Sequence, residues 1–124
     1  MENKKDNFVI DEKEFEVAQE EARKSTGLYV HKFKKPFEYM GKTYNELIFD
    51  WDSLTGRDSL DIEAEIETTT GRAVIVPAFA GEYLIRMAAK ACTEPIGHDA
   101  IEFMSLVDYN KIKSQARSFL MAAE

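Results

Sequence analysis

The feature that most constrains this chain is a stretch of aromatic and β-branched residues over 28–50 that surrounds one glycine. Such residues favour strands, and a glycine between two runs of them is typical of a hairpin turn. We therefore expect a β-hairpin that turns at Gly41. Pro36 has no amide hydrogen to donate to a sheet, so the first strand should be an edge strand or be interrupted there. The residues that favour strands are Tyr29, Val30, Phe33, Phe37, Tyr39, Thr43, Tyr44, Leu47, Ile48 and Phe49.

The segment before the hairpin has the composition of a helix. Residues 11–24 are strong helix formers, with acids early and bases late as the helix dipole favours. The apolar stripe of this helix is thin, so the helix should bury little surface. We expect it to end with Gly27 in a left-handed cap conformation. The apolar stripe consists of Phe15, Ala18 and Ala22.

Four helical segments are predicted after the hairpin. Thr55 and Asp58 have the spacing of a capping box, which would begin a helix over about 56–68. Residues 73–77 should form a short strand or an extended linker. Phe79, Tyr83, Met87 and Ala91 follow at steps of four, which indicates an amphipathic helix that belongs in the core. A short helix over about 99–104 and a last helix from about Asp108 complete the pattern.

The spacing in the last helix allows two interpretations. Its apolar residues lie three, four, three and four positions apart, as in a coiled-coil seam. Two heptads are few for a coiled coil, so an ordinary amphipathic helix packed on the domain is favoured. These residues are Tyr109, Ile112, Ala116, Phe119 and Ala123.

Together these segments predict an α+β fold, in which an N-terminal β-hairpin packs with a small bundle of four to five helices. At 124 residues the chain has room for one sizeable core. We expect residues 1–27 to form a loosely docked helical extension and residues 28–124 to form a single α+β domain.

The charge distribution argues against several classes of partner. Residues 1–70 carry 10 basic and 17 acidic residues, a net charge of −7, whereas residues 71–124 carry 6 of each. This acidity disfavours nucleic acids and anionic membranes. The basic cluster of Lys32, Lys34 and Lys35 reads as protection of a strand edge. With one cysteine, and with no apolar run of about 20 residues, we expect a cytoplasmic protein.

The candidate chemical groups do not form a recognisable active site. The acids around residues 50–61 lack the spacing of a calcium loop, and neighbouring carboxylates are read as solvated helix faces. Cys92 and His98 lack an orienting third group, so the cysteine is read as a small buried thiol. We therefore expect a protein that is not an enzyme and has no cofactor and no metal. The acids concerned are Asp50, Asp52, Asp58, Asp61, Glu63 and Glu67.

A resemblance to a known family covers residues 33–121. The run from Phe37 to Leu47, with Leu54-Thr55-Gly56-Arg57-Asp58, resembles the opening of the tail assembly chaperones of long-tailed bacteriophages and prophages. The later part of the chain continues the match in order. It supplies Glu82-Tyr83-Leu84, Asp108-Tyr109 and Phe119-Leu120.

The resemblance implies a helper that binds the tape-measure protein and keeps it soluble in the bacterial host cytoplasm. The tail-tube protein and a second copy of the chain are further partners to consider, and the helper is expected to be absent from the mature virion. The partner should lie on apolar helix faces, although most of these residues also suit a core. The candidate partner-binding residues are Phe79, Tyr83, Met87, Ile112, Phe119, Leu120 and Met121.

Two alternatives stay open at this point. One is a structural tail-completion or connector protein of a phage, which would remain in mature particles. The other is a small carboxylate-dependent hydrolase or a metal-binding protein.

Overall fold

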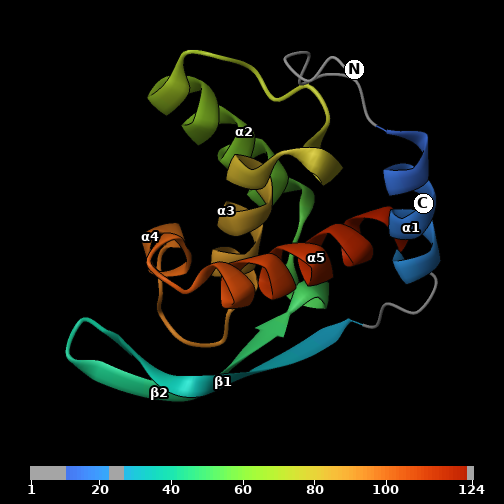
Figure 1. Ribbon diagram of the computed structural model, residues 1–124. Coiled ribbons are helices and arrows are strands. Elements are labelled where there is room, and N and C mark those ends of the chain that lie inside the picture. The colour runs from blue at the N-terminus through green and yellow to red at the C-terminus, as the bar shows by residue number, and fades with distance from the viewer. Residues whose placement is uncertain (1–10, 23–26, 123–124) are drawn as a thin grey trace.

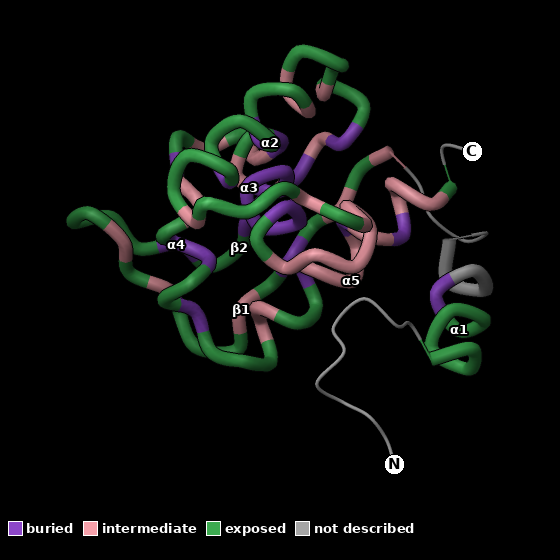
Figure 2. The backbone as a smooth tube through the Cα atoms, turned by 90° about the horizontal axis from the view of Figure 1, so that it is seen from above, coloured by how far each residue is buried: buried purple, intermediate pink, exposed green. Residues whose placement is uncertain are grey.

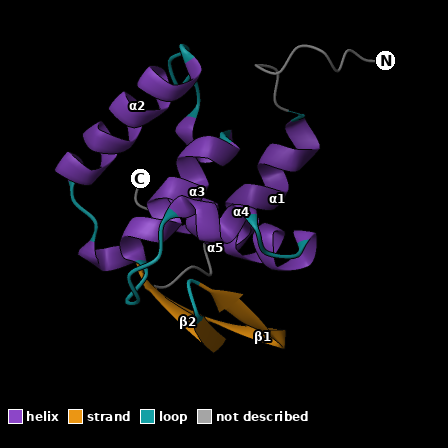
Figure 3. Ribbon diagram, turned by 90° about the vertical axis from the view of Figure 1, so that its left-hand side faces the viewer, coloured by secondary structure: helices purple, strands orange, loops and turns teal. Residues whose placement is uncertain are grey.

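The hairpin and the helices form two parts of one α+β architecture. The computed structural model describes residues 11–22 and 27–122, with side chains for all of these except 19–22. In this part of the chain, a two-stranded antiparallel sheet lies beneath five α-helices (Figures 1 and 3), so the predicted fold class is confirmed. The elements are α1 (Glu12–Ala22), β1 (Leu28–Tyr39), β2 (Lys42–Asp50), η1 (Trp51–Ser53), α2 (Gly56–Thr70), η2 (Pro77–Phe79), α3 (Gly81–Ala91), α4 (His98–Glu102) and α5 (Leu106–Ala122), where η marks a 3₁₀ turn.

The hairpin turn consists of Met40 and Gly41. Both residues have positive φ, 52° and 77°, which is the backbone of a two-residue turn whose twist matches that of the strands. Glycine adopts this conformation without cost, whereas a side chain such as that of Met40 is strained by it. Met40 is 85% exposed, so packing does not compensate for the strain.

We expect Met40→Asn to stabilise the protein by about 0.5–1 kcal/mol, because asparagine tolerates the left-handed conformation. Met40→Val should instead destabilise it, since a β-branched side chain suits this conformation least. Urea unfolding of both variants measures the two effects. Equal stability of the two variants would contradict the strain argument.

The first strand is irregular at the predicted place. The pairing register shifts between Lys32 and Phe37, in the stretch that contains Pro36. A proline cannot donate to the ladder, and such a shift accommodates the missing hydrogen bond. The strand therefore continues on both sides of the irregularity.

The second helix begins and ends with identifiable contacts. The Asp58 amide donates to the Thr55 hydroxyl (3.4 Å) and the Thr55 amide donates to the Asp58 carboxylate (2.8 Å), so the predicted capping box is confirmed. The helix runs to Thr70, two residues farther than predicted. The Thr70 hydroxyl donates to the carbonyl of Ile66 (2.8 Å), and Gly71 then takes a left-handed conformation with φ of 77°.

Three local predictions are wrong. Gly27 does not have positive φ; instead, the Asp52 carboxylate stands 1.9 Å from the place that a Cβ would take there. Phe79 belongs to η2 rather than to α3, whereas residues 73–76 form a linker, which was one of the two expected forms. The proline at the start of η2 fixes this tighter turn. The last helix also begins before Asp108, because Ser105 caps it and accepts a hydrogen bond from the Asp108 amide (3.1 Å).

The third helix lies at the centre of the molecule (Figure 2). It packs against α2, α4 and α5 and has buried side chains around most of its circumference, so the prediction that it belongs in the core is confirmed. Residues of β2 and η1 close the core from the hairpin side, where Phe49 and Trp51 stack with ring centroids 5.5 Å apart. The largest fully buried hydrophobic side chains are Trp51, Phe49, Leu47, Ile62, Leu84, Ile101 and Ile112.

The N-terminal helix packs against α5. Ala18 is buried, whereas Phe15 is 41% exposed and touches Phe79 with ring centroids 6.5 Å apart. The predicted helix of residues 11–24 thus appears over Glu12–Ala22. Residues 23 and 24, the side chain of Ala22 and the seam position Ala123 lie outside the described residues.

A buried histidine links the hairpin to the last helix. The ring of His31 is 2% exposed, and its Nε2 donates to the Asp108 carboxylate (2.8 Å). The Nδ1 shares a hydrogen bond with the Tyr29 hydroxyl (2.8 Å). The other Asp108 oxygen accepts from the Ser105 hydroxyl (2.8 Å), so the chain of hydrogen bonds runs from β1 to the cap of α5.

We expect His31→Leu to destabilise the protein by about 2 kcal/mol, because it removes two hydrogen bonds and leaves Tyr29 and Asp108 without these partners in a half-buried setting. The matched control is Tyr39→Phe. Tyr39 donates from the same strand to Asp99 of α4 (3.0 Å), but in an exposed setting. The control should cost less than about 0.5 kcal/mol in urea unfolding, and similar losses in both variants would argue against the link.

Candidate functional site

A groove lies where the beginning of α3 meets the corner between α4 and α5. Its volume is about 620 Å³. Gly81 allows the close approach of α3 and α5, since a Cβ at this position would lie 3.0 Å from the Tyr109 hydroxyl. The lining residues are Gly81, Glu82, Ile85, Glu102, Met104, Leu106 and Tyr109, which combine an apolar floor with two carboxylates.

Large apolar side chains are exposed beside this groove. Phe103 is 77% exposed, Leu106 is 70% exposed and Val107 is 62% exposed, all within five consecutive residues. We call these three residues the apolar corner. Single exposed apolar residues are ordinary, but a cluster of them is typical of an interaction surface. The corner therefore marks this side of the molecule as the candidate site.

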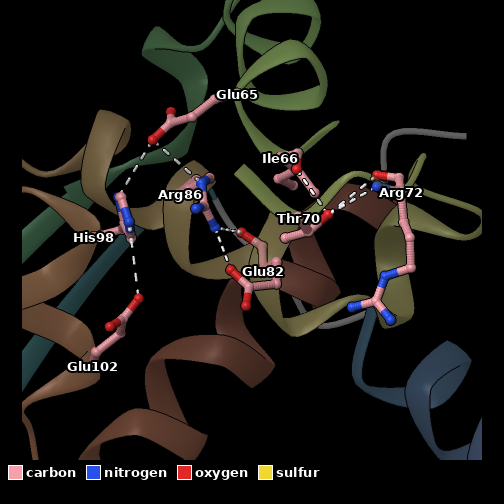
Figure 4. Close-up of polar contacts among 8 residues, drawn as sticks. All are labelled: Glu65, Ile66, Thr70, Arg72, Glu82, Arg86, His98 and Glu102. Atoms are coloured by element: carbon pink, nitrogen blue, oxygen red, sulfur yellow. Dashed lines mark hydrogen bonds and ion pairs between the residues drawn. The ribbon is translucent and has the colours of Figure 1, made fainter. Parts of the chain in front are cut away.

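The carboxylate of Glu82 is held by a buried arginine. Arg86 is 5% exposed, and its guanidinium pairs with Glu82 one helical turn away on α3 (Figure 4). Its Nε also lies 3.4 Å from the Glu65 carboxylate of α2. A buried guanidinium is costly unless carboxylates surround it, so Arg86 fixes both acids at the surface.

The second carboxylate of the groove belongs to the same polar cluster. His98 is half-buried, with Nδ1 3.8 Å from Glu65 and Nε2 3.8 Å from Glu102 (Figure 4). Three carboxylates thus surround one guanidinium and one imidazole. Glu65, Glu82 and Glu102 are 46%, 56% and 50% exposed, so each also faces solvent. We call these three residues the acidic rim.

The pKa of Tyr109 depends on both acids of the groove. Partial burial raises the pKa of its hydroxyl, and the negative charges of Glu82 and Glu102 raise that pKa further. The two carboxylates therefore act on one hydroxyl between them. Two carboxylates thus line the groove, and the Lys113 ammonium lies 5.0 Å from the centroid of the Tyr109 ring.

We expect Glu102→Gln to lower the pKa of Tyr109 towards its ordinary value, since the substitution removes a negative charge that favours the neutral phenol. Tyrosine labelled with ¹³C at Cζ allows an NMR titration of this residue. Glu63→Gln changes the net charge equally on an exposed face of α2 and should leave the Tyr109 titration unchanged. The same shift in both variants would show that the two acids of the groove do not act locally.

Three of the predicted partner-binding residues are part of the core. Tyr83, Met87 and Ile112 are 4%, 2% and 0% exposed, so a partner does not reach them in this conformation. The Tyr83 hydroxyl shares a hydrogen bond with Ser59 (2.6 Å), and Ile112 packs beneath α3. Their regular spacing reflects the interior of the domain.

The remaining predicted residues are partly accessible. Phe119 packs over Trp51 with ring centroids 6.3 Å apart, and Leu120 and Met121 follow it near the end of α5. The Arg117 guanidinium lies over the ring of Phe79, 5.4 Å from the ring centroid. Phe79 also lines a second, smaller pocket of about 210 Å³, which Glu82 lines as well. The structure does not bring these four residues into the groove.

The acids that raised the question of calcium serve local contacts. Asp58 caps α2, and the Asp61 carboxylate lies 3.6 Å from the guanidinium of Arg57, which stands four residues earlier in the same helix. Within residues 11–22 and 27–122, no group of three or more histidine, cysteine, aspartate or glutamate side chains is placed to hold a metal ion. Partial burial raises the pKa of the Cys92 thiol, and a hydrogen bond with the Glu94 backbone opposes this increase.

Sequence reasoning missed the apolar corner and the acidic rim. The corner has no helical periodicity, because Phe103 follows α4 and the other two residues begin α5. A usable signal was present nonetheless. Apolar residues on both sides of a helix-capping serine, as in Phe103-Met104-Ser105-Leu106-Val107, cannot all face one core.

Comparison of the chain with protein-family models, with curated proteins and with solved structures finds no significant match. No helix in the described part of the chain has both the length and the apolar character needed to cross a bilayer.

Proposed function

We propose that this protein is a tail assembly chaperone of a long-tailed bacteriophage or prophage. It binds the tape-measure protein in the bacterial host cytoplasm and keeps it soluble until the tail-tube protein polymerises around it. The proposal takes its identity from the family resemblance over residues 33–121. The structural observation that carries it is the apolar corner beside a groove with two carboxylates.

The physical requirements of such a helper agree with this surface. A protein that shields an amphipathic helix needs exposed apolar side chains to cover the apolar face of its partner. It also needs a charged exterior, so that the complex stays dispersed. The apolar corner offers the first, and a net charge of −7 offers the second.

We expect co-expression with the tape-measure protein from the same genome to raise the soluble amount of that protein several-fold. Leu106→Ser should abolish most of this gain, because it removes a 70% exposed side chain at the centre of the apolar corner. Leu60→Ser is the matched control, since Leu60 is 54% exposed on α2 and lies outside the groove. Soluble and pelleted fractions quantify the effect.

An unchanged solubility, with no complex recovered by affinity purification, would refute the proposed function. Mass spectrometry of purified virions separates it from the structural alternative. A chaperone should be absent from the mature particle, whereas a tail-completion or connector protein should be present in it.

A further inference from the structure

We infer that the groove between α3 and the α4–α5 corner binds an amphipathic helix whose apolar ridge is flanked by lysine or arginine. This inference deepens the proposed function, on which it rests, by naming the chemistry of the partner segment. Its test uses synthetic helices and is therefore independent of the tape-measure protein.

The floor of the groove suits an apolar ridge. Ile85 and Met104 are buried at 4% and 8% exposure and form its base, whereas Leu106 stands at its border. A helix presents one apolar side chain per turn along its ridge, about every 5.4 Å. The apolar corner extends the floor outward, so that a ridge can cover Leu106 and Phe103 as well.

The carboxylates at the border of the groove favour a partner with positive charge. Glu82, Glu102 and Tyr109 all line the groove, and both carboxylates raise the pKa of the Tyr109 hydroxyl. Of the basic groups near these acids, Arg86 pairs with Glu82 and is 5% exposed, and His98 lies 3.8 Å from Glu102 and is 30% exposed. The Lys113 ammonium lies 5.0 Å from the centroid of the Tyr109 ring. A bound helix therefore meets carboxylates. Lysine and arginine can place their stems along apolar surface and their charged ends at such carboxylates.

A second copy of this chain is a poorer occupant. The chain has a net charge of −7, so two copies repel each other, and the acidic rim adds like charges at the contact. A basic amphipathic helix has the opposite sign and meets no such penalty. The charge of the groove thus favours a foreign segment over self-association.

The test uses two labelled peptides of about 18 residues, which form about five helical turns. Both carry a leucine ridge; one has lysines beside the ridge and the other has glutamates at the same positions. Fluorescence anisotropy with the full chain should show about tenfold tighter binding of the lysine peptide at about 0.05 M salt. The difference should shrink at about 0.5 M salt, because the rim is partly exposed.

Charge reversal locates the binding site. Glu102→Lys should weaken binding of the lysine peptide about tenfold and strengthen binding of the glutamate peptide. Glu63→Lys is the matched control, since it changes the net charge equally on an exposed face of α2. Leu106→Ser should weaken binding of both peptides. Amide chemical-shift perturbation by the lysine peptide should centre on residues 81–85 and 102–109, and unchanged spectra elsewhere would verify the fold of each variant.

Three results would overturn the inference. Equal weakening by Glu102→Lys and Glu63→Lys would mean that only the net charge matters. Unchanged peptide binding in Leu106→Ser would exclude the groove. Sedimentation that reveals dimers of the chain, lost in Leu106→Ser, would assign the groove to a second copy.

The inference and the proposed function can fail separately. Binding of the lysine peptide to the groove, with no effect on the solubility of the tape-measure protein, would refute only the proposed function. Rescue of the tape-measure protein that is insensitive to Glu102→Lys and Leu106→Ser would refute only the inference.

Discussion

The structure depends on the burial of α3, which lies among α2, α4 and α5. A helix in such a position is expected to be apolar all round, yet its sixth residue is Arg86. A guanidinium that is 5% exposed needs carboxylates within reach, because desolvation of an unpaired charge costs more than the fold can supply. Glu82 and Glu65 supply these carboxylates. Two of the three carboxylates of the acidic rim are thus a consequence of placing a charge on the central helix, whereas Glu102 lies beside His98.

The position of the apolar corner follows from a second anchor. Asp108 is the third residue of α5, and it is held towards the hairpin by His31. Residues two positions apart on a helix point about 200° away from each other, since each residue turns the helix by about 100°. Fixing Asp108 towards β1 therefore directs Leu106 to the opposite side of α5. The contact between His31 and Asp108 holds α5 to the hairpin on one side, and Leu106 is left exposed on the other side.

Much of the fold was predictable from local patterns. The glycine turn, the Thr55 capping box and the stripe from Tyr83 to Ala91 each depend on residues close together in sequence. Part of what local patterns did not predict concerns contacts between distant residues. The Asp52 side chain approaches the backbone of Gly27, and His31 bonds Asp108, which stands 77 positions away. No local periodicity contains such information, so only the assembled chain places them.

The candidate site was harder to predict for a related reason. Periodic spacing identifies the face of a helix that packs well, and this domain consumes that face internally, as the burial of Tyr83 and Ile112 demonstrates. The same row of apolar side chains along a helix cannot be enclosed in the core and cover a partner at the same time. A surface that is free to bind must come from apolar residues that the core leaves over. In this chain such residues gather where α4 and α5 meet around a capping serine, on both sides of which apolar side chains stay exposed.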